Sequence, residues 1–417
     1  MSGRVPSHLA AEGAKFRVWI LVAALALAAA GTISSTVFLA LALLGAVKFH
    51  RGARAQEREA AAASSLPPVS ILKPVHGLEE RLKENIESFF RQDYPAYEIL
   101  FAAHDEHDPA LSLIREVAAR YPQVPCRIFV TGPPPWPNRP SFSFSVMADA
   151  AAHSIFVTSD SDVEVASNYL REVVPPLGNP STGMVTCVYR GKNAGGFWSG
   201  IDAIGMSVEM TAGVVTANLL EGMRFGLGPT IAVRQDALAS IGGYQVLAGY
   251  LSNDFIIGNL IEKAGYRVVL SRHVVDHVAP PMTFRLMWER HMRWTEGTRY
   301  SRPLGHAGTA LIYAMPYGIL GFLAAAGLGH MAVGAVLLGA AIANRMIESW
   351  AIGWGVVRDP VARRRPWLYP LRDLLGVVEW CASYMSGKIM WRGSRYDLVK
   401  GGRLVPRENS PESSRAR

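Results

Sequence analysis

Two aspartates with one residue between them, Asp160 and Asp162, are the residues whose type and spacing most clearly suggest chemistry. They directly follow the apolar run 154–158. Carboxylates at positions i and i+2 after a buried strand can project from one turn toward a single hard cation, and Mg²⁺ and Mn²⁺ prefer such oxygen ligands together with substrate phosphates. Charged turns after strands are common, so the pair alone is weak evidence, and a solvated turn is the alternative interpretation.

A third acid and a pair of arginines lie further along the chain. Asp254 stands among apolar residues at the predicted start of a helix, where a helix cap is the ordinary interpretation. Arg290 and Arg293, at i and i+3, share one face of a predicted helix beside Trp294. Guanidinium groups stay charged and bind phosphate oxygens bidentately, so the pair could neutralise the diphosphate of a departing nucleotide. A basic patch next to a membrane is the alternative.

An alternation of strands and helices over residues 65–300 must position these side chains. Strands are predicted at four places, 69–72, 98–103, 127–130 and 154–158, with helical spacing between them. This alternation predicts an α/β domain with a mostly parallel sheet and a ligand site at the carboxyl ends of the strands. Asp105 directly follows the second strand, so acids are expected to gather at that edge of the sheet.

A charge-free run, residues 18–47, predicts one transmembrane anchor. At about 1.5 Å per residue the run is ample for a hydrocarbon core of roughly 30 Å. The alternative is a cleaved signal peptide with its cleavage site at 28–30, but the apolar run continues well beyond that point. Residues 1–17 are expected to form an N-terminal tail.

A second membrane region is predicted after the α/β domain. Residues 303–357 are expected to form a transmembrane helical hairpin with its turn near 327–330, since 303–344 contain no Asp, Glu, Lys or Arg. Basic residues flank both membrane regions, which by the positive-inside rule places the domain in the cytosol. Residues 366–391 are apolar but charged at four positions, which predicts an interfacial or third C-terminal membrane helix. Residues 401–417 are polar and expected to be a disordered tail.

The composition supports a mixed protein with a soluble part and membrane segments. Half of the residues are hydrophobic and 18% are charged, which is too apolar for an ordinary soluble protein and too polar for a transporter of many spans. The net charge of +8 gathers beside the apolar runs, a pattern that suits anionic lipid headgroups rather than nucleic acid. Cys126, Cys187 and Cys381 form no CxxC pair, so neither a disulfide framework nor a zinc site is indicated.

Taken together and in this order, these elements resemble the family 2 and family 21 glycosyltransferases, and most closely the ceramide glucosyltransferases. The resemblance covers nearly the whole chain and rests on the aspartate pair, the Arg-x-x-Arg-Trp run and five further segments, 68–74, 92–98, 104–110, 242–244 and 391–396. It implies a GT-A type nucleotide-sugar-binding domain with a mostly parallel sheet, an N-terminal transmembrane helix and a C-terminal transmembrane hairpin.

The resemblance also implies a role for each candidate residue. Asp105 would contact the uracil of a UDP-sugar, and Asp254 would be the catalytic general base. Asp160 and Asp162 would hold Mg²⁺ or Mn²⁺ on the diphosphate of the bound nucleotide-sugar. The family's (Q/R)xxRW motif is matched by Arg290, Arg293 and Trp294. These residues would help to bind the diphosphate and to shape the acceptor site.

This chain departs from the family pattern at two places. Asn253 stands where the family usually has an acidic residue before the base, which removes a charge that could influence Asp254. A lysine is usual some twenty residues upstream of the aspartate pair, but segment 138–142 offers only Arg139. A catalytically inactive membrane scaffold that binds lipid is therefore an alternative function, although all the acids and both arginines are retained.

The expected activity is that of an inverting hexosyltransferase that acts on a membrane lipid. UDP-glucose and ceramide are the first choice, and UDP-N-acetylglucosamine with a hopanoid such as bacteriohopanetetrol is the alternative. A processive polysaccharide synthase would need a channel that about three spans cannot easily build. The expected location is the bacterial inner membrane with the catalytic domain in the cytosol. No nucleic-acid partner is expected, and the donor sugar and oligomeric state stay open.

Overall fold

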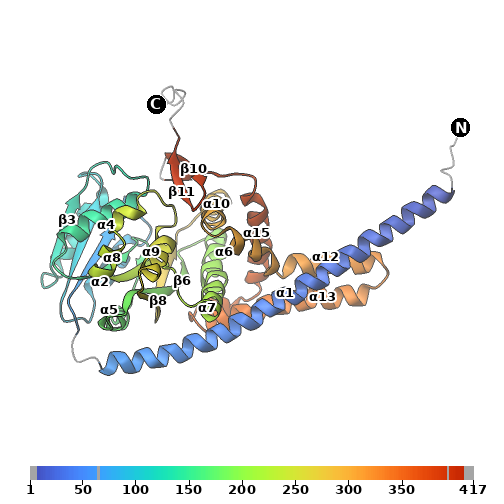
Figure 1. Ribbon diagram of the computed structural model, residues 1–417, viewed down its shortest axis with the longest axis horizontal. Coiled ribbons are helices and arrows are strands. Elements are labelled where there is room, and N and C mark those ends of the chain that lie inside the picture. Colours follow the sequence, from blue (N-terminus) through green and yellow to red (C-terminus); the bar gives the residue numbers. More distant parts are fainter. Residues whose placement is uncertain (1–6, 63–65, 392–393, 408–417) are drawn as a thin grey trace.

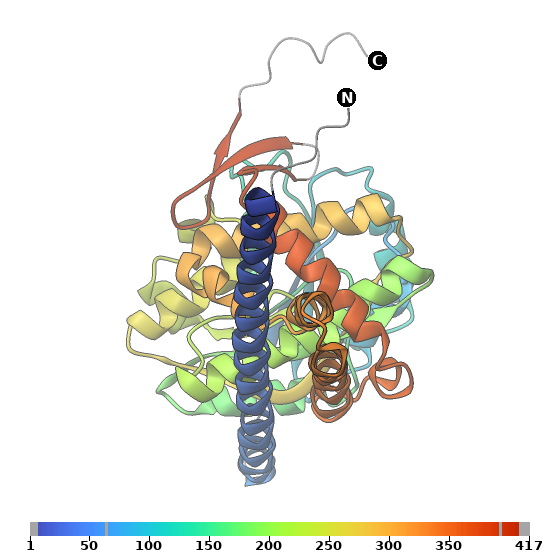
Figure 2. The ribbon, with the colours of Figure 1, turned by 90° about the vertical axis from the view of Figure 1, so that its right-hand side faces the viewer.

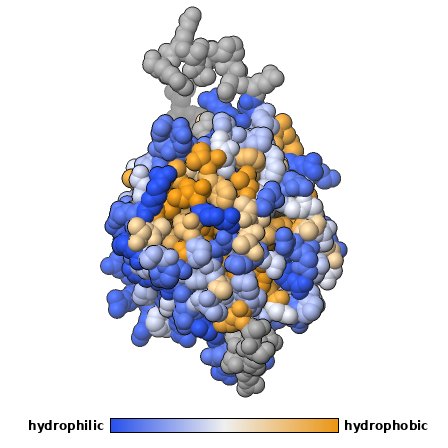
Figure 3. Space-filling view, turned by 90° about the vertical axis from the view of Figure 1, so that its left-hand side faces the viewer, coloured by the Kyte–Doolittle hydropathy of each residue, from blue (hydrophilic) through white to orange (hydrophobic). Residues whose placement is uncertain are grey.

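The computed structural model describes residues 7–62, 66–391 and 394–407. An α/β domain, a group of helices on one side of it and a long N-terminal helix make up the described chain (Figure 1). On the face of the molecule at the left of Figure 1, hydrophilic side chains surround a smaller apolar area (Figure 3).

The α/β domain is built on an eight-stranded sheet with the strand order β3-β2-β1-β4-β7-β6-β8-β5. Its strands are β1 (Val69–Pro74), β2 (Tyr97–Ala103), β3 (Cys126–Val130), β4 (Ile155–Ser159), β5 (Val163–Glu164), β6 (Thr182–Asn193), β7 (Thr230–Arg234) and β8 (Arg267–Ala279). Pairing is parallel through β3-β2-β1-β4 and between β6 and β8, and antiparallel elsewhere. Every residue of β1 and β2 is buried, as expected where helices cover both faces. The predicted α/β class and mostly parallel sheet are confirmed.

Short helices connect the strands, and two of them begin at a side-chain cap. The helices are α2 (Leu82–Phe90), α3 (Pro109–Ala119), α4 (Arg139–Ala150), α5 (Tyr169–Val173), α8 (Gln235–Ser240) and α9 (Asn253–Lys263), with 3₁₀ turns η1 (Pro175–Gly178) and η3 (Tyr244–Leu247). Asp108 caps α3 by accepting from the Ala110 N–H, and Asn138 caps α4 by accepting from the Ser141 N–H. Segment 138–142 is therefore a helix start.

A second set of helices lies between the sheet and the long helices. The run α6 (Phe197–Gly205), η2 (Met206–Met210) and α7 (Thr211–Leu220) is continuous, with a π-helical turn at η2, and it is joined by α10 (Phe284–Ser301), α14 (Pro360–Arg364) and α15 (Leu368–Ser383). In Figure 2 the hairpin described next is seen almost end-on while α15 lies across it.

Among the described residues, three helices are long and apolar enough to cross a membrane, or up to four if one bent pair counts as a span. The three are Lys15–Arg54, Phe197–Leu220 and Met331–Trp354, and the bent pair is Pro303–Leu311 with Met315–Gly327. The first of the three lies in α1 (Ser7–Ala62), the second is the run α6–η2–α7, and the third is α13 (Met331–Glu348) with η5 (Ser349–Trp354). The bent pair consists of α11 (Pro303–Gly308) with η4 (Thr309–Leu311), followed by α12 (Met315–Gly327). The most apolar window of Phe197–Leu220 is 61% buried, against 17% and 28% for the other two, so that run is an internal helix of the fold.

The helices α12 and α13 form a hairpin, and α1 lies along it (Figure 1). Gly31 on α1 faces the ring of Tyr317, and Gly327 faces Leu21. Close approach of this kind requires small residues at the contact. The hairpin turns between Gly327 and Met331, in the region that the sequence predicts.

The helix α15 has its charged residues on the inside. Arg372, Asp373 and Glu379 are buried, whereas Leu371 and Val378 are 38% and 52% exposed. Its 16 residues span about 24 Å at 1.5 Å per residue, less than the roughly 30 Å of a bilayer core. An outward apolar face on a helix too short to cross favours the interfacial alternative for residues 366–391.

Two expected tails differ from the structure. The helix α1 begins at Ser7, inside the segment 1–17 that was expected as a tail. Disorder from residue 401 is wrong for 403–406, because β11 (Arg403–Pro406) pairs with β10 (Ser394–Val399), which pairs with β9 (Lys388–Trp391). Alternate side chains of this small sheet, Ile389, Tyr396, Leu398 and Leu404, bury a core of their own. The predicted tail beyond residue 407 lies outside the described residues.

Candidate active site

A cavity of about 810 Å³ lies between the sheet and the second set of helices. Its lining contains six of the predicted site residues, Asp160, Asp162, Asp254, Arg290, Arg293 and Trp294. Asp105 is not among the lining residues; it is exposed after β2, where its carboxylate accepts from the His107 N–H at 2.9 Å. The structure therefore brings together side chains that are more than a hundred residues apart.

The aspartate pair follows β4, as predicted, and contacts a histidine that the sequence analysis missed. His277 on β8 places its Nε2 at 2.9 Å from Asp162 Oδ2 and at 3.1 Å from the Arg290 guanidinium. Burial alone would raise the pKa of Asp162, but the charges of His277, Arg290 and Lys73 outweigh it and lower that pKa. Asp162 is therefore held as an anion that faces the cavity.

Lys73, at the carboxyl end of β1, is the lysine that contacts the aspartate pair. Its Nζ donates to the Asp160 carbonyl at 2.8 Å and lies over the Phe89 ring. Burial lowers the pKa of Lys73 to about 7, although the neighbouring carboxylates of Asp160 and Asp162 oppose the shift. The signal in the sequence is a lysine directly after the mostly apolar predicted strand 69–72. Arg139, the suggested substitute, donates instead to Ser394 Oγ at 3.1 Å.

Asp254 lies in the first turn of α9, and its surroundings make it a stronger base. The N-cap of this helix is Ser252, so the helix-cap explanation of Asp254 does not hold. Burial raises the pKa of Asp254, partly opposed by the N–H groups of Phe255 and Gly228. Asn253 also lines the cavity, and its side chain donates to Ser141 Oγ of α4 at 3.1 Å, so the position where the family usually has an acid here links α9 to α4.

Asp254 and Asp160 converge on one glycine. A Cβ added at Gly228 would lie 3.2 Å from Asp254 Oδ2 and 3.9 Å from Asp160 Oδ2. Gly228 itself lines the cavity, so the absent side chain leaves room beside both carboxylates. The predicted base and the predicted metal-binding acid thus face the same space.

The helix α10 carries the Arg-x-x-Arg-Trp run with a histidine inside it that the sequence analysis treated only as a spacer. His291 is buried, with Nε2 at 2.7 Å from Asp202 and Nδ1 at 2.8 Å from Glu379. Burial would lower the pKa of His291, but these two carboxylates raise it. The guanidinium of Arg290 lies 4.6 Å from the centre of the Trp294 ring. The motif is therefore fixed from behind by ion pairs.

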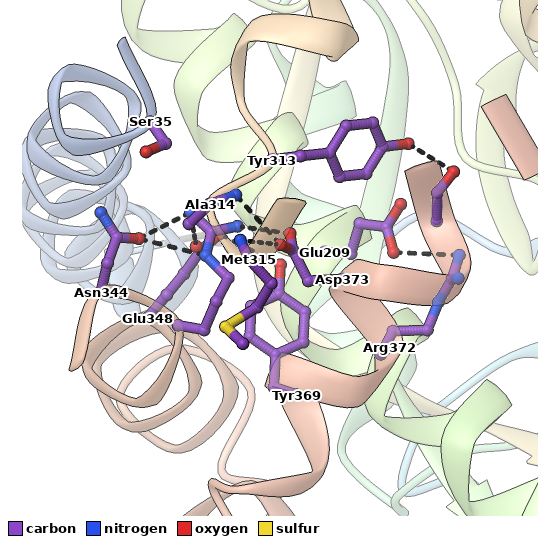
Figure 4. Close-up of polar contacts among 12 residues, drawn as sticks. Ser35, Glu209, Tyr313, Ala314, Met315, Asn344, Glu348, Tyr369, Arg372 and Asp373 are labelled. Atoms are coloured by element: carbon purple, nitrogen blue, oxygen red, sulfur yellow. Dashed lines mark hydrogen bonds and ion pairs between the residues drawn. The ribbon is translucent and has the colours of Figure 1, made fainter. Parts of the chain in front are cut away.

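Buried charges connect this motif to the hairpin, and Figure 4 shows the part of the network around Arg372 and Asp373. Arg372 lies 2.9 Å from Glu379 and 3.0 Å from Glu209. The next residue of α15, Asp373, pairs with Arg345 of α13 at 3.3 Å and accepts from the N–H groups of Ala314 and Met315. Breaking a buried pair strongly destabilises a protein, so this network ties the apolar hairpin firmly to α10.

The residues present suit a divalent cation. Asp160 and Asp162 supply hard oxygen ligands, and Asp162 Oδ1 is buried without a hydrogen-bond partner in the described structure. Within residues 7–62, 66–391 and 394–407, no three or more His, Cys, Asp and Glu side chains are grouped to hold an ion alone. A cation here would therefore take its other ligands from a phosphate and water, as Mg²⁺ usually does.

Comparisons with known proteins agree on one family. The model of glycosyl transferase family 21 matches residues 18–404. Ceramide glucosyltransferase 3 of Caenorhabditis elegans is 24% identical over 82% of this chain and 75% of its own length. Ceramide glucosyltransferase 1 of the same organism is 24% identical over 55% of this chain and 49% of its own length.

Among solved structures, the chain is similar to the mannosyltransferase PcManGT from Pyrobaculum calidifontis in complex with GDP-Man and Mn²⁺. The TM-score is 0.49 and the identity 17%, over 84% of this chain and 99% of that one. The family match, in contrast, extends from the helix α1 to the last described strand, β11. The chain belongs to glycosyl transferase family 21.

Proposed function

We propose that the protein transfers one sugar from a UDP-sugar to a hydroxyl of a membrane lipid, with UDP-glucose as donor and ceramide as acceptor. One observation carries the proposal: the cavity that holds Asp160 and Asp254 is also lined by the apolar run η2–α7 and by the segment 302–313, which leads into the hairpin. Such a cavity can receive a charged nucleotide at one end and a lipid at the other. The similarity to ceramide glucosyltransferases supports the choice of acceptor.

The chemistry assigned to Asp254 is general base catalysis. Its carboxylate accepts the proton of the lipid hydroxyl while that oxygen attacks the anomeric carbon. The bond from the anomeric carbon to the phosphate oxygen breaks on the opposite face, and UDP leaves with the electron pair. The configuration is inverted, and a β-glycolipid results. The raised pKa of Asp254 makes it a better base than an exposed aspartate.

Cationic side chains of the cavity would stabilise the negative charge that develops on the leaving diphosphate. Arg290 and Arg293 line it, and fixed cations in a site shielded from water stabilise such charge by several kcal/mol. Asp160 and Asp162 would hold Mg²⁺ or Mn²⁺, which adds further positive charge when bound. Asp105 is proposed to meet the uracil from its position after β2.

The substitution Asp254→Asn tests the role of the base. We expect transfer to fall by about 10²- to 10⁴-fold, the usual contribution of general base catalysis, while UDP-sugar affinity changes less than about twofold. Glycolipid formation and nucleotide binding are measured in the same vesicles. The control is Asp236→Asn, because Asp236 pairs with Arg234 outside the cavity. Equal loss of binding and transfer would exclude Asp254 as the base.

The donor and acceptor are tested together. Membranes that contain the protein are incubated with labelled UDP-glucose and UDP-N-acetylglucosamine, and the glycolipid is identified by mass spectrometry. A glucosylated ceramide supports the proposal. An N-acetylglucosaminyl hopanoid would instead identify UDP-N-acetylglucosamine as the donor and a hopanoid as the acceptor. UDP release that does not respond to added lipid would exclude a lipid acceptor. The domain is proposed to lie in the cytosol of a bacterium, at the inner membrane.

A further inference from the structure

We infer that the acceptor's hydrocarbon chain enters the cavity from the membrane through a passage between α7 and the segment 302–313. This inference rests on the proposed function and specifies where the lipid lies. The passage has two walls, both formed by residues that line the cavity that also holds Asp254. The lipid hydroxyl would then reach the base while the hydrocarbon chain stays in apolar surroundings.

The first wall is one stripe along η2 and α7. Its members recur every three or four residues and so share one helical face: Met206, Met210, Gly213, Val214 and Ala217. Met210 is 40% exposed, and Gly213 is exposed, within a run that is otherwise mostly buried. The stripe is apolar, and its residues are smaller toward the end of α7 than in η2. The smaller residues leave space for an alkyl chain.

The second wall is a membrane helix interrupted beside the cavity. The helical axis bends by 42° between Pro303–Leu311 and Met315–Gly327. Gly305, Thr309, Ile312 and Tyr313 from this region line the cavity. Irregular backbone in an apolar segment occurs where it is buried in protein or lines a cavity. The π-helical turn η2 stands on the opposite wall, and such turns are frequent at functional sites.

The anchor helix α1 braces both walls on their membrane side (Figure 1). Ser34 Oγ donates to the Leu311 carbonyl at 2.7 Å, and Lys48 Nζ donates to the Asn218 carbonyl at 2.5 Å. Residues 35–47 of α1, between these two contacts, contain no Asp, Glu, Lys or Arg. The gap between the walls is therefore at the level of helices that belong in the bilayer.

The occupant that suits these walls is a hydrocarbon chain. Met206, Met210, Val214 and Ile312 provide dispersion contacts and no hydrogen-bonding groups on their side chains, whereas a growing polysaccharide needs many polar partners along its path. The carboxylates of Asp160, Asp162 and Asp254 line the same cavity from the turn after β4 and from α9, whereas these apolar side chains come from η2, α7 and the segment 302–313. The charged residues beside the walls are paired, Glu209 with Arg372 and Arg302 with Glu221. A lipid with one polar end suits this arrangement.

The substitution Gly213→Trp tests the passage. A Cβ at Gly213 meets nothing within 4 Å, so an indole here extends into open space, and Trp is a better helix former than Gly. We expect transfer to a long-chain acceptor to fall at least about tenfold by obstruction of the alkyl path. Transfer to a short-chain, water-dispersible acceptor with the same head group should change less than about twofold, since the hydroxyl still reaches Asp254.

The matched control is Gly339→Trp, because Gly339 is exposed on α13 and a Cβ there also meets nothing within 4 Å. It should leave both activities unchanged. Wild-type activity of Gly213→Trp on the long-chain acceptor would overturn the inference, and so would equal loss with both acceptors. A wild-type protein that glycosylates neither acceptor would refute the proposed function instead.

A second measurement does not depend on any variant. An acceptor with a photoreactive group at the end of its alkyl chain is illuminated with the wild-type protein, and the labelled peptides are identified. We expect label in residues 206–217 and 302–313, competed by unlabelled acceptor. Label confined to the outer surface of the hairpin would overturn the inference.

Discussion

Replacing Gly228 by alanine tests the convergence of the two key carboxylates. The new Cβ would lie 3.2 Å from Asp254 Oδ2, closer than the ordinary contact range of 3.4–4 Å, so that carboxylate must retreat by a few tenths of an ångström. A misplacement of 1 Å can cost about 10²-fold in rate, so this smaller shift predicts a kcat about 3- to 10-fold lower. The contact with Asp160 Oδ2, at 3.9 Å, is ordinary, so donor binding should change less than about twofold.

The assay is initial-rate glycolipid formation in vesicles, with thermal unfolding measured in parallel. Gly228 does not have a left-handed φ, so alanine adds no backbone strain and the melting temperature should stay close to that of the wild type. Gly178→Ala is the control, because a Cβ there meets nothing within 4 Å. An unchanged kcat in Gly228→Ala would refute the placement of Asp254 beside Asp160.

Further predictions concern the buried cations and the metal. Burial lowers the pKa of Lys73 from 10.5 to about 7, so between these pH values the unfolded chain binds more protons than the folded chain. The free energy of unfolding should therefore rise with pH in this range. Chemical denaturation at several pH values should show a smaller slope of this free energy against pH in Lys73→Met. His291→Gln removes the imidazole between Asp202 and Glu379 and should cost about 3–5 kcal/mol of unfolding free energy, with a weaker effect in His330→Gln, whose histidine lies in the hairpin turn. Chelation of divalent ions should abolish transfer, and added Mg²⁺ or Mn²⁺ should restore it in the wild type but not in Asp162→Asn. Full activity in the presence of chelator would contradict the role assigned to the aspartate pair.

The strands near the site were predictable because of how the sheet is buried. Two of the buried strands contain mostly apolar runs, and a lysine or an acid follows each run within two residues. Val69 to Leu72 and Ile155 to Thr158 show this directly, and all of these residues are buried. Local sequence therefore indicated the edge of the sheet at which the ligand site lies.

The contacts behind the site could not be predicted in the same way. His277 meets Asp162, and His291 meets Glu379, across separations of 115 and 88 residues. No local pattern encodes such distances. Lys73 is visible in the sequence as a charge at the end of a mostly apolar strand, but its direction, toward Asp160 and away from solvent, depends on the neighbouring strand β4.

The helix α15 illustrates a further limit of composition. Its charged residues are compatible with a water-facing side or with a buried network, and only partners on other helices decide between them. Arg345 of α13 and Glu209 of η2 are those partners, so the charged side of α15 faces inward. Hydropathy patterns record the period of a helix and leave its orientation undetermined.

The most direct test of the central claim is the product formed by the purified protein in lipid nanodiscs with UDP-glucose and ceramide. The convergence of Asp160, Asp254 and the arginines at one cavity predicts a lipid one hexose heavier, with a β-anomeric proton in its NMR spectrum and one UDP released per lipid glycosylated. Bound UDP-sugar without any glycosylated lipid would contradict the account, as would a product in the α configuration.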